Sequence, residues 1–113
     1  MISKESRSQA LSTLLDARMQ HTRWVSEVLN NPNPQVEIDP SLCAFGRWLH
    51  SADEELQALP EFSALDRPHL ELHQAYRLIR TTPDLEPRRI DIRQLSLRLI
   101  ARIDALEQRL QKR

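Results

Sequence analysis

The sequence predicts an all-α protein, an antiparallel four-helix bundle with an additional short helix that carries the cysteine. Two observations favour helices over sheet. The chain of 113 residues has one glycine and only two Phe, two Trp and one Tyr, whereas aromatic residues are enriched in strands. Its apolar residues also recur at steps of three, four or seven, which is helical spacing. We expect a single stand-alone domain, residues 1–113, long enough to bury a core.

Charge and composition exclude several classes of partner. Sixteen basic and sixteen acidic residues cancel, so nothing predicts binding to nucleic acid or to an anionic membrane. No apolar run approaches the roughly 20 residues that span a bilayer, and the N-terminus lacks the apolar core of a signal peptide. The single cysteine forms no internal disulfide and favours a reducing compartment. The predicted location is therefore cytoplasmic.

The first helix is expected from Lys4 to Asn30. His21 falls on its inward face, beside Trp24. Residues 30–34 contain two prolines and three asparagines, which end the helix. The apolar stripe consists of Ala10, Leu11, Leu14, Ala17 or Arg18, His21, Val25 and Val28.

A short helix carrying the cysteine is expected from Ser41 to His50. Asp39 as N-cap and Pro40 in the first turn form a good start signal. Gly46 lies almost one turn after Cys43, so the backbone beside the thiol is bare. Since a glycine inside a helix costs about 1 kcal/mol relative to alanine, its presence indicates that another helix approaches closely there.

The next segment opens with Ser51–Glu54, which has the pattern of a capping box and predicts a helical turn that ends at Pro60. A third long helix then begins at Glu61 or Asp66 and extends to about residue 80. We prefer Asp66 as its cap, because Pro68 is tolerated only in a first turn.

The last two long helices each show one apolar face. That of the third helix consists of Leu65, His69, Leu72, His73, Tyr76 and Ile79. The last helix is expected over residues 88–112, with its inward stripe at Ile92, Leu95, Leu99, Ile103, Leu106 and Leu110.

Three histidines and the cysteine form a candidate metal site. His69 and His73 are four residues apart, which places both rings on one face of a helix. With His21 and Cys43 they offer three imidazoles and one thiolate, a ligand set that suits tetrahedral zinc. His50 lies about 10 Å further along the helix axis from Cys43, too far to share the ion. Each residue alone is more typical of core packing; their coincidence on inward faces favours a metal.

The same residues resemble a known family. The segment Cys43–Leu49 resembles the C-x-F/L-G-x-W-L signature of the bacterial chemoreceptor zinc-binding domain, His21–Trp24 its H-x-x-W element, and His69–His73 its H-x-x-x-H pair. Order and spacing agree over nearly the whole chain. The resemblance implies a helical bundle with a zinc site made by His21, Cys43, His69 and His73. Similar proteins are cytoplasmic signalling modules, often fused to chemotaxis transducers or diguanylate cyclases, and those linked to cyclases dimerise.

The expected function is that of a zinc-binding sensory or regulatory module in chemotaxis or cyclic-di-GMP signalling. Changes in zinc level, or oxidation of Cys43 by an oxidant such as hypochlorous acid, are the expected stimuli. Without a transducer coiled coil or cyclase segment, the output is expected to pass through a signalling partner or a homodimer. No enzymatic activity or small-molecule substrate is expected, because a closed zinc shell offers no position for water.

Two alternatives remain at this point. The zinc is purely structural in an adaptor or dimerisation protein, or the bundle is a hemerythrin-like di-iron protein. The di-iron class requires more histidines and inward carboxylates than the sequence contains.

Overall fold

The computed structural model describes residues 2–30, 43–81 and 86–111. All regular secondary structure in these ranges is helical, which confirms the predicted fold class. The helices are α1 (Lys4–Asn30), α2 (Ala44–Ser51), α3 (Glu54–Gln57), α4 (Pro60–Ser63), α5 (Asp66–Thr81) and α6 (Glu86–Gln111).

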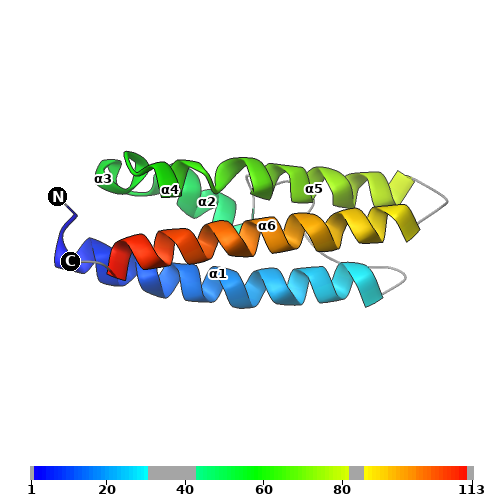
Figure 1. Cartoon of the computed structure of the whole chain (residues 1–113), viewed down its shortest axis with the longest axis horizontal. Coiled ribbons are helices and arrows are strands. Elements are labelled where there is room, and N and C mark those ends of the chain that lie inside the picture. Colours follow the sequence, from blue (N-terminus) through cyan, green and yellow to red (C-terminus); the bar gives the residue numbers. More distant parts are fainter. Residues whose placement is uncertain (1, 31–42, 82–85, 112–113) are drawn as a thin grey trace.

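Three long helices determine the shape of the molecule, which measures 49 × 22 × 19 Å. The chain runs in one direction along α1 and α5 and returns along α6, which packs against both (Figure 1). The short helices α2, α3 and α4 lie beside one end of α5, and α2 contacts α5 directly. The described ranges contain no fourth long helix, so the predicted four-helix arrangement is not confirmed in detail.

Helix α1 has the predicted bounds. Its first turn is capped by the Ser3 hydroxyl, which accepts a hydrogen bond from the Ser6 N–H at 3.1 Å. The Ser6 hydroxyl in turn donates to Asp53 Oδ2 at 2.6 Å and ties the start of α1 to the residue that precedes α3. The buried face of α1 consists of Ala10, Leu14, Ala17 and Val28.

The start of the cysteine helix differs from the prediction. Helix α2 begins at Ala44, and Cys43 is its N-cap, with extended φ of −74° and ψ of 155°. Ser41 was the expected first residue; it lies outside the described residues, as do the expected cap Asp39 and Pro40. Cys43 therefore lies immediately before the first residue of α2 and not within the helix.

The capping box predicted at residues 51–54 is wrong. Ser51 is the last residue of α2, and Asp53, the N-cap of α3, makes no side-chain capping hydrogen bond. Its carboxylate accepts from Ser6 instead. The predicted start at Asp66 is close to the structure: Asp66 is the first residue of α5, and Pro68 falls in its first turn, where it blocks no helical hydrogen bond.

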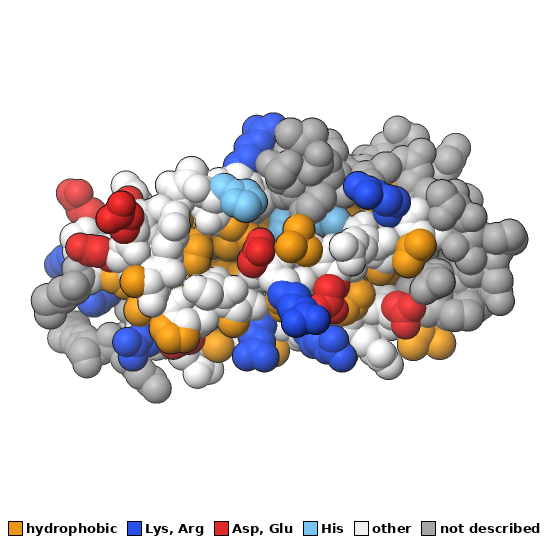
Figure 2. Space-filling model, turned by 90° about the horizontal axis from the view of Figure 1, so that it is seen from above, with side chains coloured by type: hydrophobic (Ala, Val, Ile, Leu, Met, Phe, Trp, Pro, Cys, Tyr) orange, Lys and Arg blue, Asp and Glu red, His pale blue; other side chains and the backbone are white. Residues whose placement is uncertain are grey.

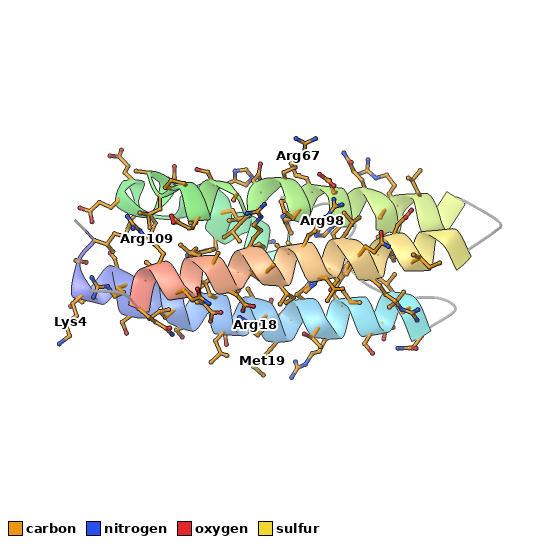
Figure 3. All side chains as sticks on the ribbon, viewed as in Figure 1. Lys4, Arg18, Met19, Arg67, Arg98 and Arg109 are labelled. Atoms are coloured by element: carbon orange, nitrogen blue, oxygen red, sulfur yellow. The ribbon has the colours of Figure 1, made fainter. Side chains whose placement is uncertain are left out.

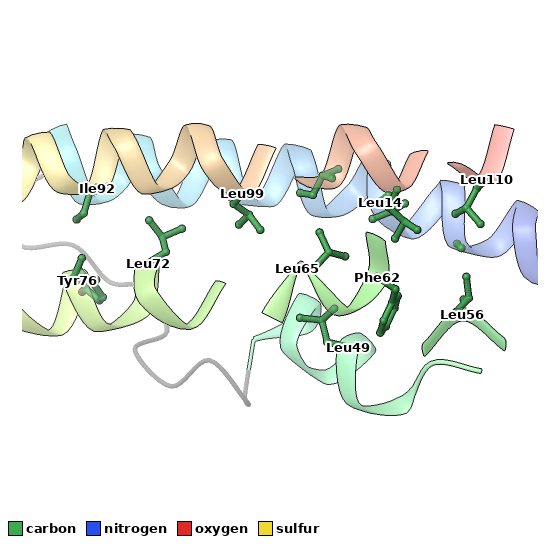
Figure 4. Close-up of a cluster of buried hydrophobic side chains, with 14 of the residues drawn as sticks. Leu14, Leu49, Leu56, Phe62, Leu65, Leu72, Tyr76, Ile92, Leu99 and Leu110 are labelled. Carbon is green, nitrogen blue, oxygen red and sulfur yellow. The ribbon is translucent and has the colours of Figure 1, made fainter. Parts of the chain in front are cut away.

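The core runs along the space between the long helices and continues past Leu49 of α2 and Phe62 of α4 (Figure 4). Leu56 and Leu110 lie at that end of the core. Leu95 of the predicted α6 stripe is only partly buried, and the side chain of Ile79 is not described. The largest side chains with almost no exposed surface are Leu14, Leu65, Leu72, Tyr76, Ile92, Leu99, Ile103, Leu106 and Leu110.

Truncation of Leu65 should destabilise the protein strongly. Its side chain is 0% exposed, so Leu65→Ala leaves a cavity and is expected to lower the free energy of unfolding by about 3 kcal/mol. Leu97 is 70% exposed, and Leu97→Ala serves as the matched control with an expected change within about 0.5 kcal/mol. Urea denaturation of both variants measures the difference, and equal effects would contradict the assigned core.

The surface carries both signs of charge, interspersed over the face seen in Figure 2. This agrees with the formal net charge of zero. Within the described ranges, no helix is both long and apolar enough to cross a membrane.

Candidate metal centre

Cys43, His69 and His73 come together as a group of metal donors. One ligand atom from each lies within 4.8 Å of the others, and Cys43 Sγ is 3.1 Å from His69 Nε2. In a tetrahedral zinc shell, sulfur and nitrogen donors lie roughly 3.6 Å apart, given ordinary zinc–ligand bond lengths. The three donors are therefore spaced for one small cation. Both histidines are buried, at 4% and 5% exposure, and Cys43 is half-buried.

Two helices position these donors. On α5, His69 and His73 are one turn apart, with ring centroids 4.7 Å apart and the rings edge to face. At the start of α2, the Gly46 N–H donates to Cys43 Sγ at 3.3 Å. An N–H donor at a helix N-terminus stabilises negative charge on sulfur, the form that binds metal. Gly46 is buried, which agrees with the close approach predicted from its position in the sequence.

Aromatic side chains enclose the two histidines. Trp24 of α1 lies against His73, with centroids 5.4 Å apart, and also meets Tyr76 edge to face. Phe45 of α2 meets the ring of His69 edge to face at 5.1 Å. These contacts restrict rotation of both imidazoles and keep water from them. Trp24 therefore forms part of the wall of the metal centre.

His21 does not belong to the three-donor group. It lines the same cavity of about 100 Å³ as Cys43, His69 and His73, but its Nε2 is hydrogen-bonded to Ser96 Oγ of α6 at 2.8 Å. The structure thus brings three of the four predicted ligands to coordination spacing and leaves the fourth on the cavity wall.

Two further polar residues, His50 and Ser96, lie outside the group of three donors. His50 is exposed and outside the donor group, as its place in the sequence predicted. Ser96 was not predicted. Its one signal in the sequence is a hydroxyl between Leu95 and Leu99 on the inward side of the last helix, and serines there are too common to single out.

Burial keeps two of the rings neutral. The pKa of His21 is lowered from 6.5 to about 4 by burial first and then by the charge of His73. The pKa of His69 is lowered to about 4 by burial, and then by the charges of His73, His21 and His50. At pH 7 each ring therefore keeps a nitrogen lone pair for a metal or a hydrogen bond.

The lowered pKa values predict acid sensitivity of the metal-free protein. In the unfolded chain both rings bind protons near pH 6.5, whereas in the folded protein they resist until about pH 4. Between pH 6.5 and about pH 4 the unfolded state therefore binds more protons than the folded state. The free energy of unfolding is highest above pH 6.5 and falls as the pH drops through this range. The expected loss is a few kcal/mol, at about 1.4 kcal/mol per unit of pKa difference.

Urea denaturation in the presence of a chelator, at pH 7 and pH 5, measures this loss. His21→Gln removes one of the two titrating rings and is expected to remove about half of the pH dependence. An unfolding free energy that does not change across this range would contradict the burial of the two rings.

Comparison with protein families identifies the family of this chain. A family model described as the chemoreceptor zinc-binding domain matches residues 21–79, just over half of the chain. The chain belongs to this family. The matched segment of the chemoreceptor zinc-binding domain starts at His21 and includes Cys43, His69 and His73. No match was found among curated proteins or among solved structures.

The donors in this chemoreceptor zinc-binding domain fit the metal in its name. The donors are two buried imidazoles and one half-buried thiol at coordination spacing. A set of nitrogen and sulfur donors favours zinc over magnesium or calcium. Zinc is therefore the cofactor of this domain, and Cys43, His69 and His73 form a group of possible ligands. Helix α6, whose Ser96 contacts His21, lies outside the matched residues.

Proposed function

We propose that this domain binds one zinc ion through Cys43, His69, His73 and His21, and acts as a sensory or regulatory module. The observation that carries the proposal is the buried group of three donors from α2 and α5, with His21 of α1 on the same cavity. Bound zinc supplies positive charge that keeps the cysteine sulfur ionised and, with a fourth ligand, closes a tetrahedral shell.

The ligands belong to three separate segments, so occupancy of the site alters how these segments pack. Cys43 is the N-cap of α2 and has extended φ and ψ, so it lies at the boundary of the helix. A change in its bonding shifts the start of α2 relative to α5. Zinc titration, followed by circular dichroism and by sedimentation, tests this response. Unchanged helix content and unchanged oligomeric state would refute zinc sensing.

Oxidation is proposed as a second stimulus. Cys43 is half-buried, so an oxidant such as hypochlorous acid can reach its sulfur. Two-electron oxidation gives a sulfenate, releases chloride and weakens the sulfur as a ligand. The zinc-loaded protein is expected to release metal to a colorimetric chelator when treated with one equivalent of hypochlorous acid. Retention of zinc after complete oxidation of Cys43 would refute this route.

The output is proposed to reach a signalling partner or a second copy of the chain, in a cytoplasmic pathway such as chemotaxis or cyclic-di-GMP control. The name of the family supports a link to chemoreceptors. We propose that residues 1–113 form one domain, in which α2, α3 and α4 together take the place of a fourth helix of the bundle. No catalytic role is proposed, because four protein ligands leave no position for a substrate.

A purely structural zinc remains the second candidate, favoured by the aromatic packing that holds both histidines. In that case Cys43→Ser would lower the melting temperature without altering partner binding by the folded protein. Among the residues that the structure describes, the donor group contains no carboxylate, so this group gives no support to the di-iron alternative.

A further inference from the structure

His21 has two competing roles in this molecule. As a zinc ligand it would have to join Cys43, His69 and His73, yet it is not part of their group. Its Nε2 is instead hydrogen-bonded to Ser96 Oγ at 2.8 Å. This contact joins α1 to α6 across 75 positions of the sequence.

The Ser96 contact holds the imidazole on the α6 side of the cavity. Either ring nitrogen of a histidine can bind metal. Since His21 is not part of the group, neither of its nitrogens is placed as a fourth donor in this orientation of the ring. The cavity of about 100 Å³ between His21 and the three donors is lined largely by apolar side chains, including Ala17, and gives the ring room to turn.

Side-chain contacts hold α1 on either side of His21. One turn before His21, Arg18 forms ion pairs with Asp104 and Glu107, and these pairs hold α1 against α6. Figure 3 shows Arg18 between the two helices. One turn after His21, the indole of Trp24 packs against His73. Rotation of the His21 side chain therefore requires less rearrangement than a shift of the whole helix.

We propose that Ser96 competes with the metal for His21: the imidazole is bonded either to the Ser96 hydroxyl or to zinc. Binding of zinc then breaks a specific contact between α1 and α6, so occupancy is transmitted to a helix that supplies no ligand. The inference rests on the proposed zinc site. It makes Ser96 a positioning residue that sets zinc affinity and carries the change to α6.

Removal of the hydroxyl should strengthen zinc binding, because His21 is then released without the loss of a hydrogen bond. In competition titrations with a chromophoric zinc chelator, Ser96→Ala is expected to bind zinc about fivefold more tightly than the wild type, the equivalent of roughly 1 kcal/mol. Ser96→Thr keeps a hydroxyl and should bind like the wild type. Ser12→Ala, at an exposed position of α1, is the matched control and should change nothing.

A double-mutant cycle shows whether the effect acts through His21. His21→Ala alone should weaken zinc binding, and Ser96→Ala should have no effect in that background. Weaker or unchanged binding by Ser96→Ala in the presence of His21 would overturn the competition. Such a result leaves the zinc site intact, whereas wild-type affinity in His21→Ala would instead refute His21 as a ligand.

Imidazole nitrogen NMR provides a test in the wild-type protein, independent of whether a variant folds. The His21 Nε2 resonance of the metal-free protein should shift when zinc is added. Ser96→Ala should change this resonance in the metal-free protein and leave it unchanged in the zinc-loaded protein. A His21 spectrum that is the same with and without zinc would overturn the proposal.

Discussion

Replacing Cys43 with alanine is expected to weaken zinc binding at least about a hundredfold. Structural zinc sites with four ligands bind with roughly 10–16 kcal/mol, so an equal share for one ligand is about 3 kcal/mol, or two orders of magnitude. The substitution removes the one sulfur donor, which lies 3.1 Å from His69 Nε2, and with it the acceptor of the Gly46 N–H. Competition with a chelator of known affinity measures the loss.

His50→Ala is the matched control for this experiment. His50 is exposed and outside the donor group, so its removal is expected to leave zinc affinity unchanged. If Cys43→Ala and His50→Ala bound zinc equally well, Cys43 would not be a ligand. Circular dichroism of both variants without metal separates loss of a ligand from loss of fold.

Removal of zinc is expected to lower the melting temperature of the wild-type protein by about 15–20 °C. With free zinc roughly a thousandfold above its dissociation constant, binding adds about 4 kcal/mol to the unfolding free energy. For a domain of this size each kcal/mol shifts the melting temperature by about 4–5 °C. The metal-free protein should still fold, since most of its buried leucine and isoleucine side chains lie outside the cavity of the donors.

Calorimetry with and without a chelator measures this shift. Cys43→Ala provides the control, because its melting temperature should respond little to the same chelator. An equal shift in the variant would indicate that the chelator acts elsewhere than at this site.

Much of the fold was predictable from the spacing of apolar residues. The stripe from Ile92 to Leu110 is long and regular, and the structure buries nearly all of it, because a helix of this length has one way to face the core. The end of α1 at Asn30 agrees with the end predicted from the prolines and asparagines at residues 30–34 of the sequence. Pro68 likewise fixed the start of α5 to within one residue.

The errors fell where tertiary contacts override local signals. The Asp53 carboxylate could have capped a helix, but it accepts a hydrogen bond from Ser6, 47 positions away, which no local pattern reveals. The start of α2 has a local cause: the Cys43 sulfur accepts a hydrogen bond from the Gly46 N–H, so Cys43 is the N-cap and lies just outside the helix. The contact between His21 and Ser96 was beyond prediction because it depends on how α1 packs against α6.

X-ray absorption at the zinc edge of the purified wild-type protein tests the central claim most directly. Binding by Cys43 and the three histidines predicts one zinc per chain, with one sulfur neighbour at about 2.3 Å and three nitrogen neighbours at about 2.0–2.1 Å. A shell of nitrogen and oxygen without sulfur, or protein that retains no zinc, would contradict it.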